Sequence, residues 1–342
     1  MANIVILGSG GFGLSIAIMA ERYGHKVTVW SKFQQEIDDI RTHGEHIQKL
    51  PGVPVTERII LTSDISCIKG CDMLIFGIPS SFTRSVAQEA KPYIDDKMII
   101  VNTGKGLEDV SLKFLSIVLK EELQSDNIVV LSGPSHAEEV ARGIPTTIVA
   151  ASENKAASAY VQETLSNGAL RIYLNNDVIG CEIGGALKNI IALSAGICDG
   201  LGYGDNTKAA LMTRGIHEIA KLGTAMGAQP QTFFGLTGIG DLIVTCTSMH
   251  SRNRRAGILI GQGISPEDAV KKVGTVEGYH CCKTAYALAQ KVGVELPITE
   301  QLYEILFQHG DVRKALDKLM SRAQKYEEEL KNEALSCSRK QS

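Results

Sequence analysis

One lysine in the second half of the chain lies within an apolar run. Residues 182–196 read EIGGALKNIIALSAG, and Lys188 and Asn189 stand there among isoleucine and leucine. A buried ammonium group is costly unless it has a partner. Burial and neighbouring cations would lower its pKa, which suits transfer of a proton to a reacting oxygen. Two interpretations stay open: a proton donor, or a lysine at a helix edge whose ammonium reaches solvent.

A cluster of basic and hydrogen-bonding side chains follows in residues 235–257, GLTGIGDLIVTCTSMHSRNRRAG. Glycines free the backbone before Asp241, and Ser251 and Asn253 flank Arg252, with two further arginines after them. A guanidinium group suits a phosphate because its donors match two oxygens at once. In a chain of net charge −3, this cluster favours a small phosphorylated ligand over a polymer. The alternative is a charged helix face.

A glycine-rich loop lies near the start of the chain. The segment IVILGSGGFGLSIA leads from a strand-like apolar run through G-x-G-x-x-G into a helical pattern. In this context Gly8 makes the tight turn, Gly10 lets a pyrophosphate approach the backbone, and Gly13 lets helix and strand pack closely. The helix N-terminus, at Gly11 and Phe12, then offers free N–H groups to the phosphates. The alternative is a glycine-rich turn with a packing role alone.

The end of the second predicted strand indicates which dinucleotide binds. NAD-binding folds usually carry an acid there, which binds the ribose 2′-hydroxyl. The segment KVTVWSKF instead ends with Ser31 and Lys32 and has no acid. These two side chains suit a 2′-phosphate, so we expect NADPH as the cofactor, with NADH as the alternative. Lys32 is also compatible with a plain surface lysine.

Polar residues follow other strand-like runs, at the sheet edge where ligands bind in α/β folds. NTGKGLE places Lys105 between two glycines, either as a cation on a bendable backbone or as a solvated loop lysine. LSGPSHAEEV contains Gly133, and Ser135 with Glu138 forms a capping box that predicts a helix starting there. Ser135 is then either a cap alone or a contact to an anion or nicotinamide. His136 is the one histidine of interest beside this loop.

These motifs need a sheet that brings strand ends together. The apolar runs of the first half are mostly continuous and β-branched, with helical stretches between several of them, as in a parallel α/β sheet. The predicted strands are Asn3–Leu7, Lys26–Trp30, Ile59–Thr62, Met73–Ile78, Met98–Asn102, Ile128–Leu131, Thr146–Ala150 and Arg171–Leu174. From residue 180 the pattern is helical. We therefore predict a Rossmann-type doubly wound sheet over residues 1–178, a mostly α-helical substrate domain over 179–325 and a charged tail over 326–342.

Composition excludes several classes of protein. The chain has 342 residues and a net charge of −3, so no global basic field attracts nucleic acid or an anionic membrane. We find no room for a signal peptide and no apolar run of the ~20 residues that cross a membrane, and expect a soluble, cytoplasmic protein. Eight cysteines without a CxxC pair indicate reduced thiols. The close pairs Cys67/Cys71 and Cys281/Cys282 have no partners at metal-ligand spacing, so we expect no metal.

Taken together, these segments resemble the NAD(P)-dependent glycerol-3-phosphate dehydrogenase family in its prokaryotic-type, biosynthetic form. The shared pieces are GSGGFG, GIPS, NTGKGLE, LSGPSHAEEVARG, GGALKNIIALSAG, FGLTGIGDL and SRNRRAG, and the resemblance runs from Ile4 to about Arg322. It implies a helical second domain similar to that of 6-phosphogluconate dehydrogenase, and a homodimer. It also implies reduction of dihydroxyacetone phosphate to sn-glycerol 3-phosphate, which supplies phospholipid synthesis.

The resemblance further implies roles for the matching residues. Lys188 would be the catalytic acid and base on the substrate oxygen, and Arg252 would bind the phosphate. Lys105 would contact both substrate and cofactor. The other substrate contacts would be Gly133, Ser135, Asp241, Ser251 and Asn253. The other cofactor contacts would be Gly8, Gly10, Gly11, Phe12, Gly13, Ser31, Lys32, Ala137, Thr275 and Glu277, together with Arg252.

Two positions depart from the family pattern. Many members have Trp or Tyr where Phe12 stands, and Arg or His near Ser31 and Lys32, which bears on the choice between NADPH and NADH. Two other functions compete with this interpretation. One is a two-domain reductase that acts on a β-hydroxy acid or a sugar acid, and the other is a cofactor-binding sensor without turnover. A sensor would have no need of Lys105, Lys188 and the SRN cluster together.

Overall fold

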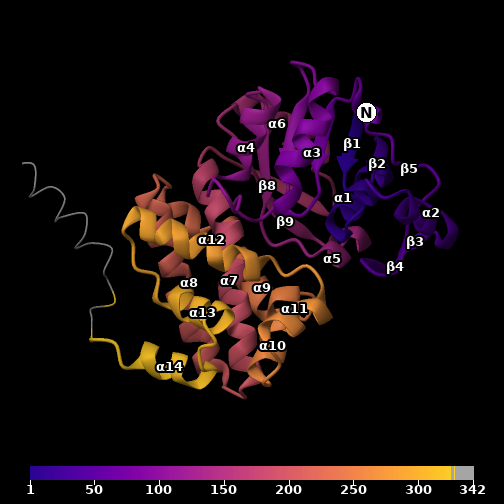
Figure 1. Ribbon diagram of the computed structural model, residues 1–342. Coiled ribbons are helices and arrows are strands. Elements are labelled where there is room, and N and C mark those ends of the chain that lie inside the picture. Colours follow the sequence, from indigo (N-terminus) through magenta and orange to yellow (C-terminus); the bar gives the residue numbers. More distant parts are fainter. Residues whose placement is uncertain (325–326, 328–342) are drawn as a thin grey trace, which may run out of the picture.

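An eight-stranded sheet organises the first half of the chain (Figure 1). In the computed structural model, which describes residues 1–324 and 327, its strands are β1 (Asn3–Leu7), β2 (Lys26–Trp30), β5 (Ile60–Thr62), β6 (Met73–Phe76), β7 (Ile99–Asn102), β8 (Ile128–Ser132), β9 (Thr146–Ala151) and β10 (Leu170–Asn175). They stand in the order β10-β9-β8-β7-β6-β1-β2-β5. Every predicted strand is therefore confirmed, with bounds close to those predicted.

The strands from β5 to β8 in this order form a doubly wound sheet. β5, β2, β1, β6, β7 and β8 all run parallel to their neighbours. In such sheets ligands bind beyond the carboxyl ends of the strands, where the strand order reverses. Here that point lies between β1 and β6, which end together at Leu7 and Phe76. The predicted Rossmann-type fold is confirmed.

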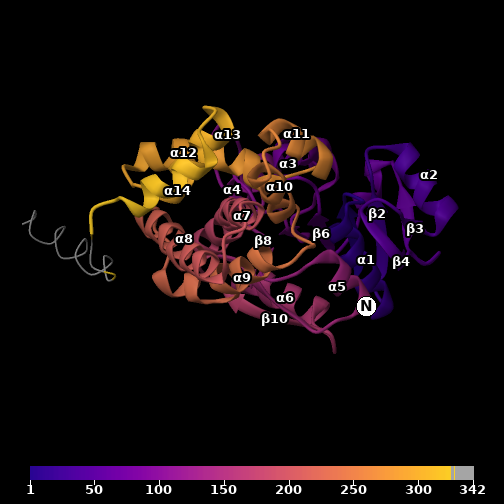
Figure 2. The ribbon, with the colours of Figure 1, turned by 90° about the horizontal axis from the view of Figure 1, so that it is seen from below.

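Helices cover both faces of the sheet (Figures 1 and 2). They are α1 (Gly11–Arg22), α2 (Gln34–His43), α3 (Thr83–Ala90), α4 (Leu115–Leu123), α5 (Ala137–Arg142) and α6 (Lys155–Leu165), with short turns η1 (Ile65–Ile68), η2 (Ser80–Phe82) and η3 (Lys91–Tyr93). Side chains alternate along β1, so that Ile4 and Ile6 share a core with α1, α2, α5 and α6. Val5 and Leu7 share the opposite core with α3 and α4. The strand reads as a continuous apolar run because both of its faces are buried.

Two features of the first half differ from the sequence analysis. β9 is antiparallel to β8, with Leu131 opposite Ala150, and β10 runs parallel to β9. The prediction of a parallel α/β sheet therefore does not hold for the pairing of β8 with β9, because a buried apolar run does not encode its direction. The hairpin of β3 (Glu45–His46) and β4 (Leu50–Pro54) is absent from the predicted strands, since it is short, partly exposed and contains Pro and Gly.

One long helix, α7 (Val178–Gly200), forms the centre of the second half (Figure 2). Around it lie α8 (Asp205–Ala225), η4 (Pro230–Phe234), η5 (Leu236–Gly240), α9 (Asp241–Thr247), α10 (Arg252–Gly261), α11 (Pro266–Val273), α12 (Glu277–Val292), α13 (Pro297–Phe307) and α14 (Val312–Met320). Glycine allows the closest packing, since a Cβ at Gly196 would stand 2.1 Å from the carbonyl oxygen of Arg254. Residues 176–324 contain no strand, so the mostly helical second half is confirmed.

α7 is long and apolar enough to cross a membrane, although we expected no such run from the sequence. It has 23 residues and a mean hydropathy of 1.4, and within residues 1–324 it is the one helix that meets both conditions. However, 89% of its apolar window is buried inside the protein. Its place at the centre of the helical core accounts for its apolar composition.

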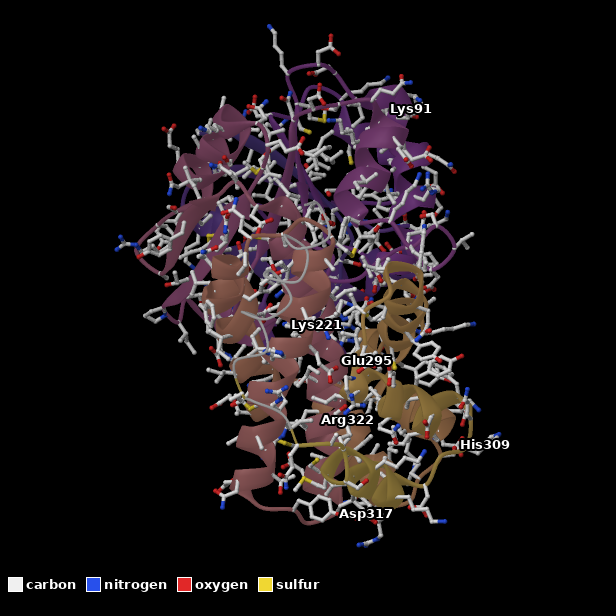
Figure 3. The ribbon with its side chains drawn as sticks, turned by 90° about the vertical axis from the view of Figure 1, so that its left-hand side faces the viewer. Lys91, Lys221, Glu295, His309, Asp317 and Arg322 are labelled. Carbon is white, nitrogen blue, oxygen red and sulfur yellow. The ribbon has the colours of Figure 1, made fainter. Side chains whose placement is uncertain are left out.

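The two halves of the chain join between the sheet and α7. The sheet ends at Asn175 and α7 begins at Val178, so the proposed division between residues 1–178 and 179–325 falls at the start of this helix. The division stays a prediction, and the charged tail, residues 326–342, lies outside the described residues except for Glu327. Near the end of the described chain, Arg322 pairs with Glu295 at 3.1 Å, and Figure 3 labels both in the helical half.

The buried carboxylate of Asp177 fixes this junction. It caps α7 by accepting from the Gly180 N–H at 2.9 Å, and it also accepts from the Gln229 N–H at 2.9 Å and the Thr232 hydroxyl at 2.6 Å. We expect Asp177→Ala to lower the free energy of unfolding by about 2–4 kcal/mol, because it removes a cap and leaves buried donors unpaired. Denaturant unfolding measures this loss.

Asp311 provides a matched control. It caps the peripheral helix α14 by accepting from two backbone N–H groups, both at 2.9 Å, in an exposed position. Asp311→Ala should cost about 1 kcal/mol, the ordinary value of a cap. Equal losses in the two variants would show that the buried bonds of Asp177 contribute nothing beyond capping.

Candidate active site

The glycine loop packs tightly against the residue that follows β6. Gly8 has a φ of +114°, and a Cβ there would stand 2.6 Å from the carbonyl oxygen of Gly77. A Cβ at Gly13 would stand 2.4 Å from the carbonyl oxygen of Gly8. The protein's own packing therefore requires these two glycines. Gly10 differs, because its Cβ would meet no atom closer than 3.7 Å, so its missing side chain leaves space beside the loop.

The start of α1 faces this space. The helix begins at Gly11, and no side chain caps it. The first N–H groups of any helix have no intrahelical acceptor, and because no side chain caps α1 they are available to phosphate oxygens. Ala137, the first residue of α5, borders the loop, since a Cβ at Gly11 would stand 3.5 Å from the Ala137 Cβ. The loop and the uncapped helix fit the pyrophosphate of a dinucleotide, with Phe12 in the first turn of the same helix.

Three charged residues from distant parts of the chain meet at the edge of the sheet. The Asp241 carboxylate, at the start of α9, lies between two lysines. Lys105 Nζ, from the loop after β7, donates to Asp241 Oδ2 at 2.7 Å and to the carbonyl oxygen of Gly133 at 2.9 Å. Lys188 Nζ, from the middle of α7, donates to Asp241 Oδ1 and, at 2.8 Å, to the hydroxyl of Thr245. We call Lys105, Asp241 and Lys188 the lysine–aspartate centre.

Burial sets the electrostatics of this centre. It lowers the pKa of Lys188 from 10.5 to about 7, and the nearby charge of Lys105 acts in the same direction, while Asp241 opposes both. Burial alone would raise the pKa of Asp241, but the charges of Lys105 and Lys188 outweigh it and keep that pKa below its usual value. The centre thus combines an ionised carboxylate with an amine that changes protonation near neutral pH.

The structure excludes one of the two interpretations of Lys188, and its role as a proton donor stays a prediction. The residue is 5% exposed, so its ammonium does not reach solvent along a helix edge. Thr245, its second partner, was absent from the predicted site. It stands four residues after Asp241, one helical turn, and that spacing is the signal that could have identified it.

In the basic cluster of residues 251–255, some side chains are hydrogen-bonded within the protein, whereas Arg252 is not. Ser251 caps α10 by accepting from the Arg254 N–H at 3.2 Å, and Arg254 pairs with Asp199 at 2.7 Å. The Asn253 amide donates to Asn189 at 2.9 Å and its oxygen accepts from the backbone of α12. Arg252 makes no hydrogen bond or ion pair within residues 1–324. The surrounding protein partly desolvates its guanidinium and lowers its pKa, with the Glu277 charge acting in the opposite direction.

The predicted capping box at Ser135 is wrong. The Ser135 hydroxyl donates to the carbonyl oxygen of Gly133 at 3.0 Å, and α5 begins at Ala137 with His136 at the N-cap and no side-chain cap. Because the helix begins two residues after Ser135, this serine lies before the N-cap position. The carbonyl oxygen of Gly133, a residue with a φ of +136°, accepts from both Ser135 and Lys105. Ser135 therefore lies close to the lysine–aspartate centre, through a shared carbonyl.

The remaining predicted cofactor contacts fall into two groups. Glu277, at the start of α12, accepts from the hydroxyl of Ser80 at 2.8 Å and so connects the helical half to the turn after β6, and Thr275 is exposed just before that helix. Ser31 and Lys32 lie beyond β2, where the Ser31 hydroxyl donates to Glu36 at 2.5 Å and Lys32 pairs with Glu89 at 2.5 Å. Neither of these two carboxylates was among the predicted site residues.

His136 and the cysteines show no arrangement for nucleophilic chemistry. Burial lowers the pKa of His136, and its Nε2 has no partner among the described residues. The four cysteines that lie close together in sequence form no disulfides, and burial raises the pKa of each thiol. They are Cys67, Cys71, Cys281 and Cys282. A raised pKa disfavours the reactive thiolate. Within residues 1–324 and 327, no group of three His, Cys, Asp or Glu side chains is placed to hold a metal ion.

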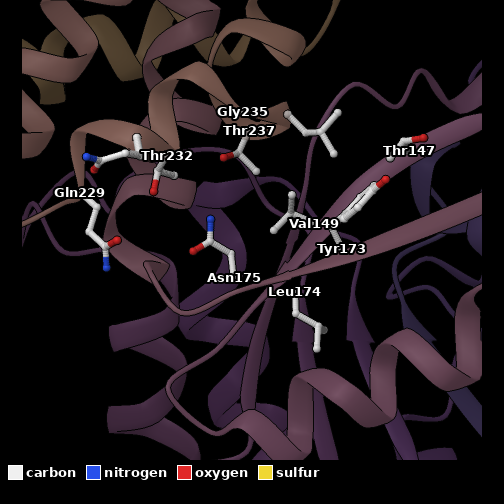
Figure 4. A pocket seen from close by; sticks show the side chains of 11 residues that line it. Thr147, Val149, Tyr173, Leu174, Asn175, Gln229, Thr232, Gly235 and Thr237 are labelled. Atoms are coloured by element: carbon white, nitrogen blue, oxygen red, sulfur yellow. The ribbon is translucent and has the colours of Figure 1, made fainter.

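A pocket lies apart from the predicted site residues. It has a volume of about 600 Å³ and lies between β9, β10 and the segment of η4 and η5, with Tyr173, Gln229, Thr232 and Thr237 in its wall (Figure 4). No predicted site residue lines it, and neither does any charged side chain. It therefore does not suit a phosphorylated ligand.

The glycine loop and the lysine–aspartate centre lie at one edge of the sheet, where the helical half covers it. This arrangement is that of a dinucleotide-dependent oxidoreductase. Residues 3–158 match the model of the NAD-dependent glycerol-3-phosphate dehydrogenase N-terminus, and residues 177–317 match that of the C-terminus.

Individual relatives agree with these matches. The chain is 49% identical over 331 residues to the glycerol-3-phosphate dehydrogenase (NAD(P)+) of Fusobacterium nucleatum, covering 96% of this chain and 99% of that one. It is 48% identical to that of Clostridium tetani, covering 95% and 94%. The crystal structure of glycerol-3-phosphate dehydrogenase from Coxiella burnetii superposes with a TM-score of 0.90 at 37% identity, covering 94% and 99%. The chain therefore belongs to the NAD-dependent glycerol-3-phosphate dehydrogenase family, and its predicted enzyme class and NAD(P) cofactor are confirmed.

The glycine loop generates a test that separates binding from packing. Gly10→Ala should leave thermal unfolding nearly unchanged, because its Cβ meets no atom within 3.7 Å, yet should weaken dinucleotide binding by about tenfold or more through contact with the pyrophosphate. Gly13→Ala is the matched comparison and should lower the unfolding temperature, because its Cβ collides with Gly8. Fluorescence titration with NADH and NADPH measures binding. Unchanged affinity in Gly10→Ala would remove this position from the pyrophosphate site.

Proposed function

We propose that this chain reduces dihydroxyacetone phosphate to sn-glycerol 3-phosphate, reversibly, with NAD(P)H. The lysine–aspartate centre carries the proposal, because it holds a proton donor in a buried position at the ligand edge of the sheet. The family match and the names of the bacterial relatives support the choice of substrate. A cytoplasmic location, a homodimer and a role in phospholipid synthesis stay predictions from the resemblance.

Lys188 is the proton donor in this proposal. A reduced nicotinamide held beside the glycine loop would supply a hydride to the ketone carbon, and electron density would then build on the carbonyl oxygen. Lys188, held by Asp241 and Thr245, gives its proton to this oxygen and completes the alcohol. A pKa of about 7 suits both the donation and its reversal at neutral pH. The buried cations also stabilise the developing oxyanion where water is excluded.

Arg252 and the start of α10 form the proposed phosphate site. Arg252 stays free of protein partners within the described residues, although Arg254, two positions on, is engaged by Asp199. The first N–H groups of α10 add donors and the positive end of a helix dipole. A phosphate bound here, away from the reacting carbonyl, orients the ketone towards Lys188, so that the binding energy of the phosphate lowers the barrier to reduction.

The direct test is oxidation of NADH and of NADPH with dihydroxyacetone phosphate, followed by absorbance of the reduced nicotinamide. Turnover with either cofactor supports the proposal. A folded protein that binds a cofactor but oxidises neither would contradict it, and unphosphorylated keto acids would then be the next substrates.

The rate of reduction should fall with rising pH. Only the protonated form of Lys188 can donate a proton, and burial lowers the pKa of this group to about 7. We therefore expect kcat to drop about tenfold per pH unit above that value. In the reverse reaction the neutral amine must accept the proton, so that rate should rise with pH and level off above the same value. Initial rates in both directions across about pH 5 to 9 provide the measurement.

Lys188→Ala should remove this pH limb and lower kcat by about 10²- to 10⁴-fold, with the affinity for cofactor little changed. Thermal unfolding confirms that the variant folds. Activity that survives within about tenfold of the wild type would reject the acid–base role.

Arg252→Ala should raise the KM for dihydroxyacetone phosphate by about tenfold or more, because it removes a charge-assisted partner of the phosphate. Arg255→Ala is the matched control, since it removes an equal charge three residues along the same helix and both arginines are exposed. Steady-state kinetics distinguish the two. An unchanged KM in Arg252→Ala, or an equal rise in both variants, would exclude a specific contact to the phosphate.

A further inference from the structure

The carboxylate of Glu36 lies beside the glycine loop and is surrounded by hydrogen-bond donors. One oxygen accepts from the hydroxyls of Ser9 and Ser31, the latter at 2.5 Å. The other accepts from Lys49 and lies 3.1 Å from Nε2 of His46. The side chain is 17% exposed. Burial alone would raise its pKa, but these hydrogen bonds hold the pKa well below its usual range, so the group is negatively charged at neutral pH.

The position of this carboxylate coincides with the ribose end of a dinucleotide site. Ser9 belongs to the glycine loop, and Ser31 follows β2 directly. In doubly wound folds an acid at the end of the second strand binds the ribose 2′-hydroxyl of NAD. Here that strand end carries no acid, and a residue in the first turn of α2 extends its carboxylate back to Ser31 instead.

The direction of these hydrogen bonds decides what ligand fits. A serine hydroxyl has one proton to donate, and Ser9 and Ser31 both donate theirs to Glu36. Towards a ligand, these hydroxyls therefore offer lone pairs only. A ribose 2′-hydroxyl can donate to them, whereas a phosphate is largely dianionic at neutral pH and only accepts. The Ser31 hydroxyl thus does not suit the 2′-phosphate that the sequence analysis assigned to it.

The cations near this site already form ion pairs with carboxylates of the protein. Lys32 pairs with Glu89 at 2.5 Å, and its side chain is 58% exposed. Lys49 donates to Glu36 itself, so its charge is balanced by the carboxylate at the same site. A 2′-phosphate would have to approach a fixed negative charge and displace existing ion pairs.

We propose that Glu36 selects NADH over NADPH, by fixing Ser9 and Ser31 as acceptors for the ribose 2′-hydroxyl and by repelling a 2′-phosphate. The proposal deepens the proposed function, on which it rests for the use of a nicotinamide cofactor. It reverses the preference for NADPH expected from the absence of an acid at the strand end.

Binding titrations without substrate test this selection. Trp30 is the only tryptophan of the chain and directly precedes Ser31, so quenching of its fluorescence reports dinucleotide binding. We expect the wild type to bind NADH at least about tenfold more tightly than NADPH, and Glu36→Gln to reduce that ratio by about tenfold. Asp39→Asn is the matched control, because it removes an equal charge from the exposed side of the same helix and should leave the ratio unchanged. Tighter binding of NADPH by the wild type, or an unchanged ratio in Glu36→Gln, would overturn the proposal.

Ser31→Ala keeps the test decisive if Glu36→Gln fails to fold. Under the proposal, loss of the hydroxyl weakens NADH binding several-fold and leaves NADPH binding unchanged. A serine that binds a 2′-phosphate would produce the opposite result, with NADPH weakened and NADH unchanged. Because these measurements need no turnover, they are independent of the substrate. The expected binding ratios together with no oxidation by dihydroxyacetone phosphate would refute the proposed function while upholding the selection.

Discussion

The site depends on one buried carboxylate, that of Asp241, held between two ammonium groups. A lysine buried without it would lose either its charge or its position, since desolvation of an unpaired ion is costly. Two lysines on one carboxylate allow the centre to keep a positive charge although Lys188 and Asp241 are buried. Its residues come from the loop after β7, the middle of α7 and the start of α9. The same contact therefore joins the sheet to the helical half, and in the proposed function its two cations stabilise an oxyanion.

Much of this arrangement follows from local sequence. The strands and the glycine loop were predictable because buried runs and G-x-G-x-x-G have local causes, namely burial on both faces and close approach of backbones. The burial of Lys188 was not, because an apolar helix with one lysine does not reveal whether a second layer covers that lysine. Arg252 and Arg254 look alike in sequence, and only the tertiary partner Asp199 separates them.

The errors also have physical causes. Ser135 satisfies a capping pattern, but α5 begins at Ala137, so His136 and not Ser135 occupies the N-cap position. The direction of β9 depends on the path of the chain between strands, which its apolar residues do not encode. Glu36 was missed because the rule for dinucleotide folds considers the end of the second strand, while this carboxylate reaches that point from the following helix.

The reversal of β9 and β10 determines where α7 can begin. β10 runs opposite to β8, so its end points away from the carboxyl ends of the parallel strands, where ligands bind. α7 must therefore run back beside β8. It passes Cys181, which shares a core with Val130, and Gly185, which lies against Ser132, before it reaches Lys188. The number of residues between the first turn of α7 and Lys188 fixes the position and direction of the lysine, because a helix rises about 1.5 Å and turns about 100° per residue. One residue inserted or deleted along this length would turn the amine away from Asp241. This stretch of chain must keep its length for the two halves to share one site.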